Sequence, residues 1–161
     1  MMQKSLKMEE YVMYVEEDLV FYNLPVNNQD ELFDFMSNEL EEKGYVTADF
    51  REAIKKREEK YPTGMKLNGL NVAIAHTEIA YARAEKLMVI KPEKPIKFRN
   101  IENLTPLDVD LVFAIILNNS DGHLEILKKI SQMFQEQEVI DSIKNIETRK
   151  ELATFMHKYF N

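Results

Sequence analysis

The histidines are the residues of this 161-residue chain best suited to chemistry near neutral pH. His76 ends the apolar segment 70–75, just where the sequence turns polar. In open α/β sheets the ligand site lies beyond the carboxyl ends of strands. A neutral imidazole there is a nucleophile through one ring nitrogen, so it could form a covalent intermediate. His76 is therefore the candidate nucleophile, and the alternative is a surface histidine that only happens to follow a strand.

The position of His123 favours the interpretation of His76 as a nucleophile. It lies in the first turn of a helix for which Ser120 is the predicted N-cap, shortly after the apolar segment 109–117. Free N–H groups and the positive end of the helix dipole favour an anion at such a terminus. The negative charge of Asp121 weakens the attraction for an anion at this helix terminus, and the alternative role of Asp121 is helix capping. Two histidines that follow two strands predict a phosphate site, because phosphoryl transfer depends mainly on positioning and charge stabilisation.

The strands that would position these histidines are read from their apolar patterns. Leu70, Val72 and Ile74 alternate with other residues, which predicts a half-buried strand that exposes His76 at its end. The segment 109–117 is apolar at nearly every position, as expected for a central strand covered on both faces. Further strands are predicted at 19–22, at 87–90 and, on an edge, at 96–98. The segment 11–15 is either a strand or part of a helix.

Capping residues and apolar periodicity predict the helices. Asn28 caps a helix that Gly44 closes, and a second helix begins after Thr47 and ends before Pro62. Three later helices are predicted: one after Ser120, a short one around 139–143, and a last one that begins at Thr148 with a capping box. The predicted inward residues are Leu32, Phe33, Met36, Leu40, Phe50, Ile54, Leu124, Leu127, Ile130, Phe134, Leu152, Phe155, Met156 and Tyr159. Strands interleaved with helices predict one layered α/β domain over residues 1–161.

Composition argues against several classes of function. The chain has no cysteine, so it has no thiolate nucleophile and no disulfide, which suits a reducing cytosol and predicts a cytoplasmic protein. The longest apolar run, 111–117, is too short to span a bilayer. The net charge of −7 without a basic run argues against nucleic-acid binding.

No motif points to a cofactor or a metal. Gly64 and Gly69 have the spacing of a Walker A loop, but Leu70 and Asn71 stand where Lys and Ser or Thr are required. The histidines are far apart in sequence and none belongs to an HExxH pair, so no metal site is predicted.

Two segments resemble a known family. Residues 57–64, Arg-Glu-Glu-Lys-Tyr-Pro-Thr-Gly, followed by 69–77, are similar to the signature of enzyme IIA domains of the bacterial sugar phosphotransferase system. The resemblance is to the fructose–mannitol type, and the Tyr-Pro-Thr-Gly element with Thr77 is closest to its galactitol-specific branch. Residues 109–113 with His123 are similar to the second motif block. The likeness covers roughly residues 15–145.

The resemblance implies a fold and a reaction. The fold would be a mixed β-sheet flanked by helices on both faces, in three layers. His76 would accept a phosphoryl group from the phosphohistidine of HPr and pass it to a cysteine of a IIB component, which serves the membrane permease IIC. His123 and Arg57 correspond to the family's second histidine and its arginine, which help to hold the phosphate. Thr63 and Thr77 are further phosphate-supporting candidates. Because this chain lacks cysteine, the acceptor must lie on another chain.

One position departs from the family pattern. The family has proline immediately before the active histidine, where this chain has Ala75. Proline would stiffen the approach to the nucleophile. The substitution leaves a second hypothesis open, a regulatory module that senses phosphorylation state and controls a partner protein without feeding a permease. The sequence does not name the sugar, because such a component contacts proteins and phosphate.

Overall fold

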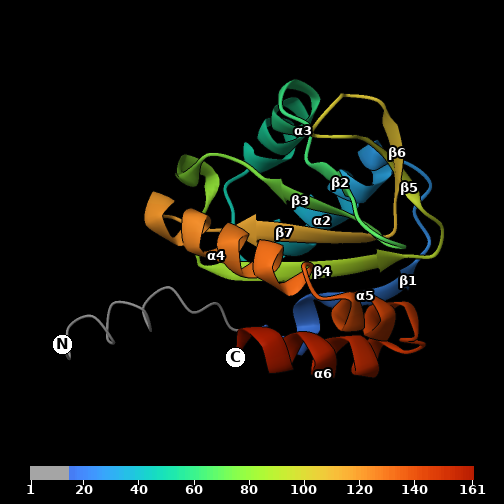
Figure 1. Cartoon of the computed structure of the whole chain (residues 1–161). Coiled ribbons are helices and arrows are strands. Elements are labelled where there is room, and N and C mark those ends of the chain that lie inside the picture. Colours follow the sequence, from blue (N-terminus) through green and yellow to red (C-terminus); the bar gives the residue numbers. More distant parts are fainter. Residues whose placement is uncertain (1–14) are drawn as a thin grey trace.

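A five-stranded mixed sheet lies at the centre of the computed structural model, which describes residues 15–161 (Figure 1). Two pairs of neighbouring strands, β1 with β4 and β3 with β7, are parallel, and the other two pairs are antiparallel. The strands follow one another across the sheet as β1 (Val20–Leu24), β4 (Lys86–Pro92), β7 (Leu111–Ile116), β3 (Asn71–His76) and β2 (Gly64–Lys66). The predicted mixed sheet is confirmed.

Helices cover both faces of this sheet. Short 3-10 turns, Glu17–Leu19 and Ile79–Tyr81, precede β1 and follow β3. The sheet residues divide between two buried clusters, one packed against α2 and α3 and the other against α4, α5 and α6. The helices are α2 (Gln29–Glu42), α3 (Phe50–Lys60), α4 (Ser120–Met133), α5 (Gln137–Lys144) and α6 (Arg149–Phe160). This gives the three predicted layers. None of these helices combines the length and apolar character that crossing a bilayer requires.

The central strand is β7, as its continuous apolar sequence predicts. Leu111, Phe113 and Ile115 pack toward α4, α5 and α6, while the residues between them pack toward α2 and α3. The neighbouring strand β3 was predicted to be half-buried, and this is wrong. Ala73 and Ala75 are fully buried, because their small side chains let α2 and α3 approach the second face.

A second sheet of two antiparallel strands, β5 (Ile96–Arg99) and β6 (Pro106–Val109), corrects two predictions. The segment 96–98 is a strand, but it belongs to this separate hairpin. The predicted strand 109–117 is divided, because Asp110 interrupts it. The Asp110 N–H donates to the carbonyl of Asn71, and its carboxylate accepts the Asn71 N–H.

Most helix boundaries agree with the capping signals. Asn28 caps α2 by accepting the Glu31 N–H at 2.8 Å, and Thr148 caps α6 by accepting the Glu151 N–H at 3.1 Å. Gly44 follows α2 with a positive φ of 76°, which glycine adopts at low cost. The segment 11–15, apart from Val15, lies outside the described residues.

Two predictions for α4 are wrong. Its N-cap is Asn119, whose side chain accepts the Gly122 N–H at 2.7 Å, and Ser120 is the first helical residue. Leu124 was expected to face inward but is 55% exposed. The helix therefore starts one residue earlier than predicted, and the side chains that it buries are Ile126, Ile130 and Met133.

Candidate active site

The sheet topology brings His76 and His123 together. Because β3 and β7 are parallel neighbours, both strands end at the same edge of the sheet. His76 is the last residue of β3 and pairs with Ile115, and α4 begins shortly after β7 ends. The two imidazole rings have their centroids 5.7 Å apart and are inclined at 67°. One strand pairing thus brings together His76 and His123, which are 47 residues apart in the sequence.

Arg57 reaches the same edge from α3. The chain leaves the C-terminal end of α3, turns at Pro62 and enters β2, which runs antiparallel to β3. This route places the last turn of α3 where β3 ends. The Arg57 Nη2 lies 3.5 Å from Nε2 of His76, which is long for a hydrogen bond. The guanidinium therefore lies beside the ring with donors left for another group.

The tautomer of His76 follows from its second contact. Its Nδ1 lies 2.8 Å from the carbonyl oxygen of Ile74. A carbonyl only accepts hydrogen bonds, so Nδ1 carries the proton. The lone pair of the neutral ring is then on Nε2, the nitrogen that faces Arg57. The ring nitrogen that carries the lone pair and the positive charge of Arg57 are therefore neighbours.

Burial and charge keep both rings neutral. His76 was predicted to be exposed, but it is only partly exposed, because Arg57 and His123 lie against it. This burial lowers the pKa of His76, and the Arg57 charge adds to the effect, against the opposing hydrogen bond to Ile74. Burial also lowers the pKa of His123, and the positive charges of Arg57 and of a protonated His76 would each disfavour its imidazolium. Each imidazole is thus uncharged at neutral pH, as a nucleophile requires.

His123 carries a nitrogen without a partner. Its Nε2 is buried and makes no hydrogen bond to the described residues. A buried polar atom left unpaired costs about 1–3 kcal/mol, so such atoms are uncommon in folded proteins. A phosphoryl oxygen attached to the neighbouring His76 would give this nitrogen an acceptor. The sequence predicted His123 near a phosphate, but not that its Nε2 would be buried without a partner among the described residues.

The two candidate threonines lie near the site with their hydroxyl groups engaged. Thr63 is buried and donates both its N–H and its hydroxyl to the carboxylate of Glu58, each at 2.7 Å. Thr77 is also buried and donates its hydroxyl to Glu78 at 2.7 Å. Both hydroxyl hydrogens are therefore already donated to carboxylates in this structure. Their direct contact with phosphate stays a prediction.

Two residues were missed by the sequence reasoning. The Tyr61 ring packs under the guanidinium of Arg57, with 4.5 Å between the ring centroid and Cζ. Glu58 is 3% exposed, although it stands in a charged run typical of a solvated helix face. The signal for Glu58 was its place in the last helical turn, five residues before a threonine. Among residues 15–161, no three His, Asp or Glu side chains are grouped as a metal site requires.

Comparison with known proteins gives a consistent answer. The family described as phosphoenolpyruvate-dependent sugar phosphotransferase system, EIIA 2, matches residues 13–159. The mannitol-specific phosphotransferase enzyme IIA component of Staphylococcus aureus is 30% identical over 138 residues, which are 84% of this chain and 89% of that protein. The galactitol-specific EIIA component of Escherichia coli K12 is 24% identical over 132 residues, 82% of this chain and 87% of that protein.

Solved structures share the fold. The nitrogen regulatory protein IIA-Ntr of Neisseria meningitidis superimposes with a TM-score of 0.72 at 24% identity, covering 88% of this chain and 95% of that one. Enzyme IIAMTL of Escherichia coli, solved in complex with phosphorylated enzyme IIBMTL, gives a TM-score of 0.71 at 16% identity, covering 91% and 99%. With nearly its whole described length matched, this chain belongs to the EIIA 2 family of the phosphoenolpyruvate-dependent sugar phosphotransferase system, a family of phosphotransferases.

Proposed function

We propose that this protein is a phosphocarrier that accepts a phosphoryl group on Nε2 of His76 from the phosphohistidine of HPr. It then passes the group to a cysteine of a separate IIB component. The observation that supports this most directly is the arrangement around Nε2: its lone pair faces Arg57, and the unpartnered nitrogen of His123 lies on the neighbouring ring. Three groups that would act on one phosphoryl group thus converge from α3, β3 and α4.

The chemistry follows from these contacts. Nε2 attacks the phosphorus, the bond from phosphorus to the donor histidine breaks, and the donor recovers its lone pair. The proton stays on Nδ1 and is donated to the Ile74 carbonyl oxygen, which stabilises the positive charge that the phosphorylated ring acquires. Arg57 and His123 would donate to the phosphoryl oxygens, where charge is spread in the transition state. In the next step a thiolate attacks, the P–N bond breaks and an S–P bond forms.

The partner surface is proposed to surround His76. Tyr61, Ile79 and Leu124 are exposed apolar side chains, 52%, 40% and 55% exposed, and each lies within a few residues of Arg57, His76 or His123. An apolar rim around a polar centre suits a transient contact of modest area, which a carrier must release. The solved complex of a related fold with phosphorylated enzyme IIBMTL supports a IIB partner. HPr and the membrane component IIC follow from the same proposal.

We infer a galactitol-like polyol system as the process served. The Tyr-Pro-Thr-Gly element at 61–64 and the galactitol-specific relative support this choice, while the mannitol-specific relative defines the competing one. The specificity would reside in the protein partner, because this component contacts phosphate and proteins. Transfer to galactitol IIB should therefore be faster than transfer to mannitol IIB under the same conditions.

A regulatory role is the second candidate. Ala75 stands before the histidine, where the family pattern that the sequence resembles has proline, and the fold is shared with a nitrogen regulatory IIA protein. A module of this kind would be phosphorylated but would not pass its phosphoryl group to a IIB cysteine.

One experiment separates the two. The protein is incubated with enzyme I, HPr and labelled phosphoenolpyruvate, isolated, and mixed with IIB components of the galactitol and mannitol types. Loss of label to a IIB component supports the carrier. Retained label, with each IIB component shown competent by another donor, supports the regulatory module. A protein that takes up no label overturns both.

A further inference from the structure

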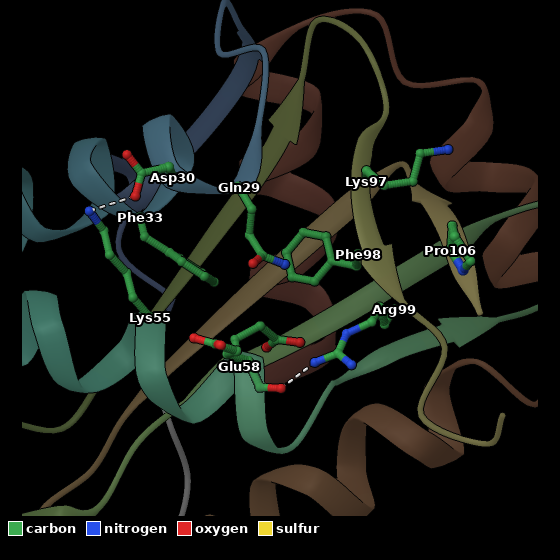
Figure 2. Close-up of a pocket in the computed structure, with 10 residues that line it drawn as sticks. Gln29, Asp30, Phe33, Lys55, Glu58, Lys97, Phe98, Arg99 and Pro106 are labelled. Carbon is green, nitrogen blue, oxygen red and sulfur yellow. Dashed lines mark hydrogen bonds and ion pairs between the residues drawn. The ribbon is translucent and has the colours of Figure 1, made fainter. Parts of the chain in front are cut away.

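Glu58 is a buried acid at the unfavourable end of a helix. It lies in the last turn of α3, where the carbonyl groups form the negative end of the helix dipole. Its side chain is almost fully buried, and no salt bridge reaches it among the described residues. Figure 2 shows Glu58 in the wall of a pocket of about 550 Å³. The ammonium groups of Lys55 and Lys97, which also line this pocket, are paired with other carboxylates. A carboxylate in this place is costly.

The hydrogen bonds that offset this cost are all donated by one residue. Glu58 accepts the Thr63 N–H with one oxygen and the Thr63 hydroxyl with the other, both at 2.7 Å. These bonds tie the last turn of α3 to the start of β2 and close the turn 59–63. Arg99 of β5 fixes the same turn from the other side by donating to the carbonyl of Glu59 (Figure 2). The path of the chain between α3 and β2 is thus held at both ends.

The fixed turn carries the residue that supports Arg57. The Tyr61 N–H donates to the carbonyl of Arg57 at 2.8 Å, and the Tyr61 ring lies 4.5 Å from Cζ of the same arginine. Tyr61 is 52% exposed, and the other cation over its ring is the ammonium group of Lys60 in the same turn, 5.4 Å from the centroid. The direction of the guanidinium toward Nε2 of His76 therefore depends on where this turn places the ring.

We propose that Glu58 and Tyr61 are positioning residues for phosphoryl transfer. Through Thr63, Glu58 fixes the turn that carries Tyr61, and Tyr61 holds Arg57 beside Nε2 of His76. The inference rests on the proposed function, because it assigns to these residues the orientation of a group that acts on the phosphoryl group. Misplacement of such a group by about 1 Å can cost far more in rate than in stability.

The proposal is tested by double-mutant cycles on the rate of phosphorylation by HPr. Glu58→Ala, Glu58→Gln and Tyr61→Ala are each made in the wild-type protein and in Arg57→Ala. Tyr61→Phe keeps the ring and tests whether the ring alone suffices, and Glu59→Ala removes a neighbouring exposed carboxylate and is the matched control. Thermal melts of every variant show whether it is folded, and intact mass shows the phosphorylated residue.

The expected result is a non-additive cycle. In the wild-type background Glu58→Ala and Tyr61→Ala should lower kcat by about threefold to tenfold, no more than the loss of Arg57 itself. KM for HPr should change little in Glu58→Ala, whereas Tyr61→Ala should also raise KM, because it removes an exposed ring from the proposed partner surface. Glu58→Gln should be milder, since its amide oxygen still accepts the Thr63 N–H. In the Arg57→Ala background all three should change the rate by less than about twofold. Tyr61→Phe should restore most of the kcat lost in Tyr61→Ala, because it keeps the ring, and Glu59→Ala should match the wild type.

Two results overturn the inference while the proposed function stands. One is a wild-type rate in Glu58→Ala and Tyr61→Ala. The other is an equal loss with and without Arg57, which would mark a structural role. If Glu58→Ala does not fold, Glu58→Gln and Tyr61→Ala decide in the same way. A wild-type protein that is not phosphorylated on His76 would instead overturn the proposed function, and the inference with it.

Discussion

Arg57 and Glu58 are adjacent in the sequence, but they belong to two regions with opposite properties. Around Arg57 the polar atoms are loosely paired: Nη2 is 3.5 Å from Nε2 of His76, and the buried Nε2 of His123 has no partner within residues 15–161. Around Glu58 the pairing is complete, because Thr63 donates twice at 2.7 Å. The first region has donors in reserve for an incoming group, and the second has none. The proposed binding site is thus distinct from the framework that holds it.

The difference is also energetic. The loosely paired groups lower the stability of the unphosphorylated protein, because buried polar atoms without partners cost free energy. Phosphorylation of His76 would supply the missing acceptors. The paired groups at Glu58 are unaffected by phosphorylation but depend on pH. Substitutions in the two regions should therefore affect different measurements.

The largest effect is expected at His76. His76→Ala should abolish phosphorylation by HPr, because the chain has no cysteine and the other histidines lack the Arg57 contact. Intact mass after incubation with enzyme I, HPr and phosphoenolpyruvate measures this directly. His157→Ala, which removes an exposed histidine from α6, should gain phosphate as the wild type does. An acid-labile phosphoryl group on His76→Ala would show that the reactive residue lies elsewhere.

The next effect is on stability at Glu58. Burial raises the pKa of this carboxyl from 4.5 to about 7, against the opposing Thr63 hydrogen bonds and the charges of Arg57 and Arg99. A raised folded-state pKa contributes stability that is present below about pH 4.5 and is lost as the pH rises through 7. The free energy of unfolding of the wild type minus that of Glu58→Gln should therefore fall by about 3 kcal/mol between pH 4.5 and 8.

Urea denaturation of both proteins at several pH values measures this difference. Glu59→Gln, at the exposed neighbouring position, is the control and should show no such trend relative to the wild type. A constant difference between wild type and Glu58→Gln would mean that the carboxyl is ionised throughout this range. The contrast between the two regions would then rest on geometry alone.

A smaller effect is expected from the groups that would hold the phosphoryl oxygens. Arg57→Ala and His123→Ala should each slow transfer by about tenfold or more, the scale of a lost hydrogen bond to a charged group. Neither should lower the melting temperature much, because both side chains have few partners in the structure. Single-turnover rates with phosphorylated HPr provide the test. Wild-type rates in both variants would make them ordinary surface groups.

The smallest effect is a shift in titration. His76 and His123 should titrate below the ordinary histidine pKa of 6.5, as seen by NMR of the ring nitrogens. Protonation removes the Nε2 lone pair, so the transfer rate should fall in acid with the titration of His76. Arg57→Ala should raise both pKa values, because the guanidinium charge disfavours the imidazolium. Unchanged values in that variant would place Arg57 away from the rings in solution.

The elements of the fold were largely predictable from local patterns. The all-apolar segment before Ser120 predicted the central strand, and the side chains of Asn28 and Thr148 predicted two helix starts, because caps and periodicity act over a few residues. The errors also have local causes. Asn119 and Ser120 are both good caps, so the sequence could not choose between them, and alanines at 73 and 75 do not reveal which face is covered.

What the sequence determined by itself was the type and order of the chemical groups: a histidine at a strand end, another in the first turn of a helix, an arginine before a proline turn, and no cysteine. Only the tertiary structure decided how these groups are arranged and protonated. Parallel pairing of β3 with β7 joins His76 to His123, and the Ile74 carbonyl selects the tautomer. Burial distinguishes Glu58 from the other acids among the 28 of the chain, because its buried carboxyl accepts hydrogen bonds from Thr63. These properties depend on distance and solvent exposure between residues far apart in the chain, which no local pattern of side chains encodes.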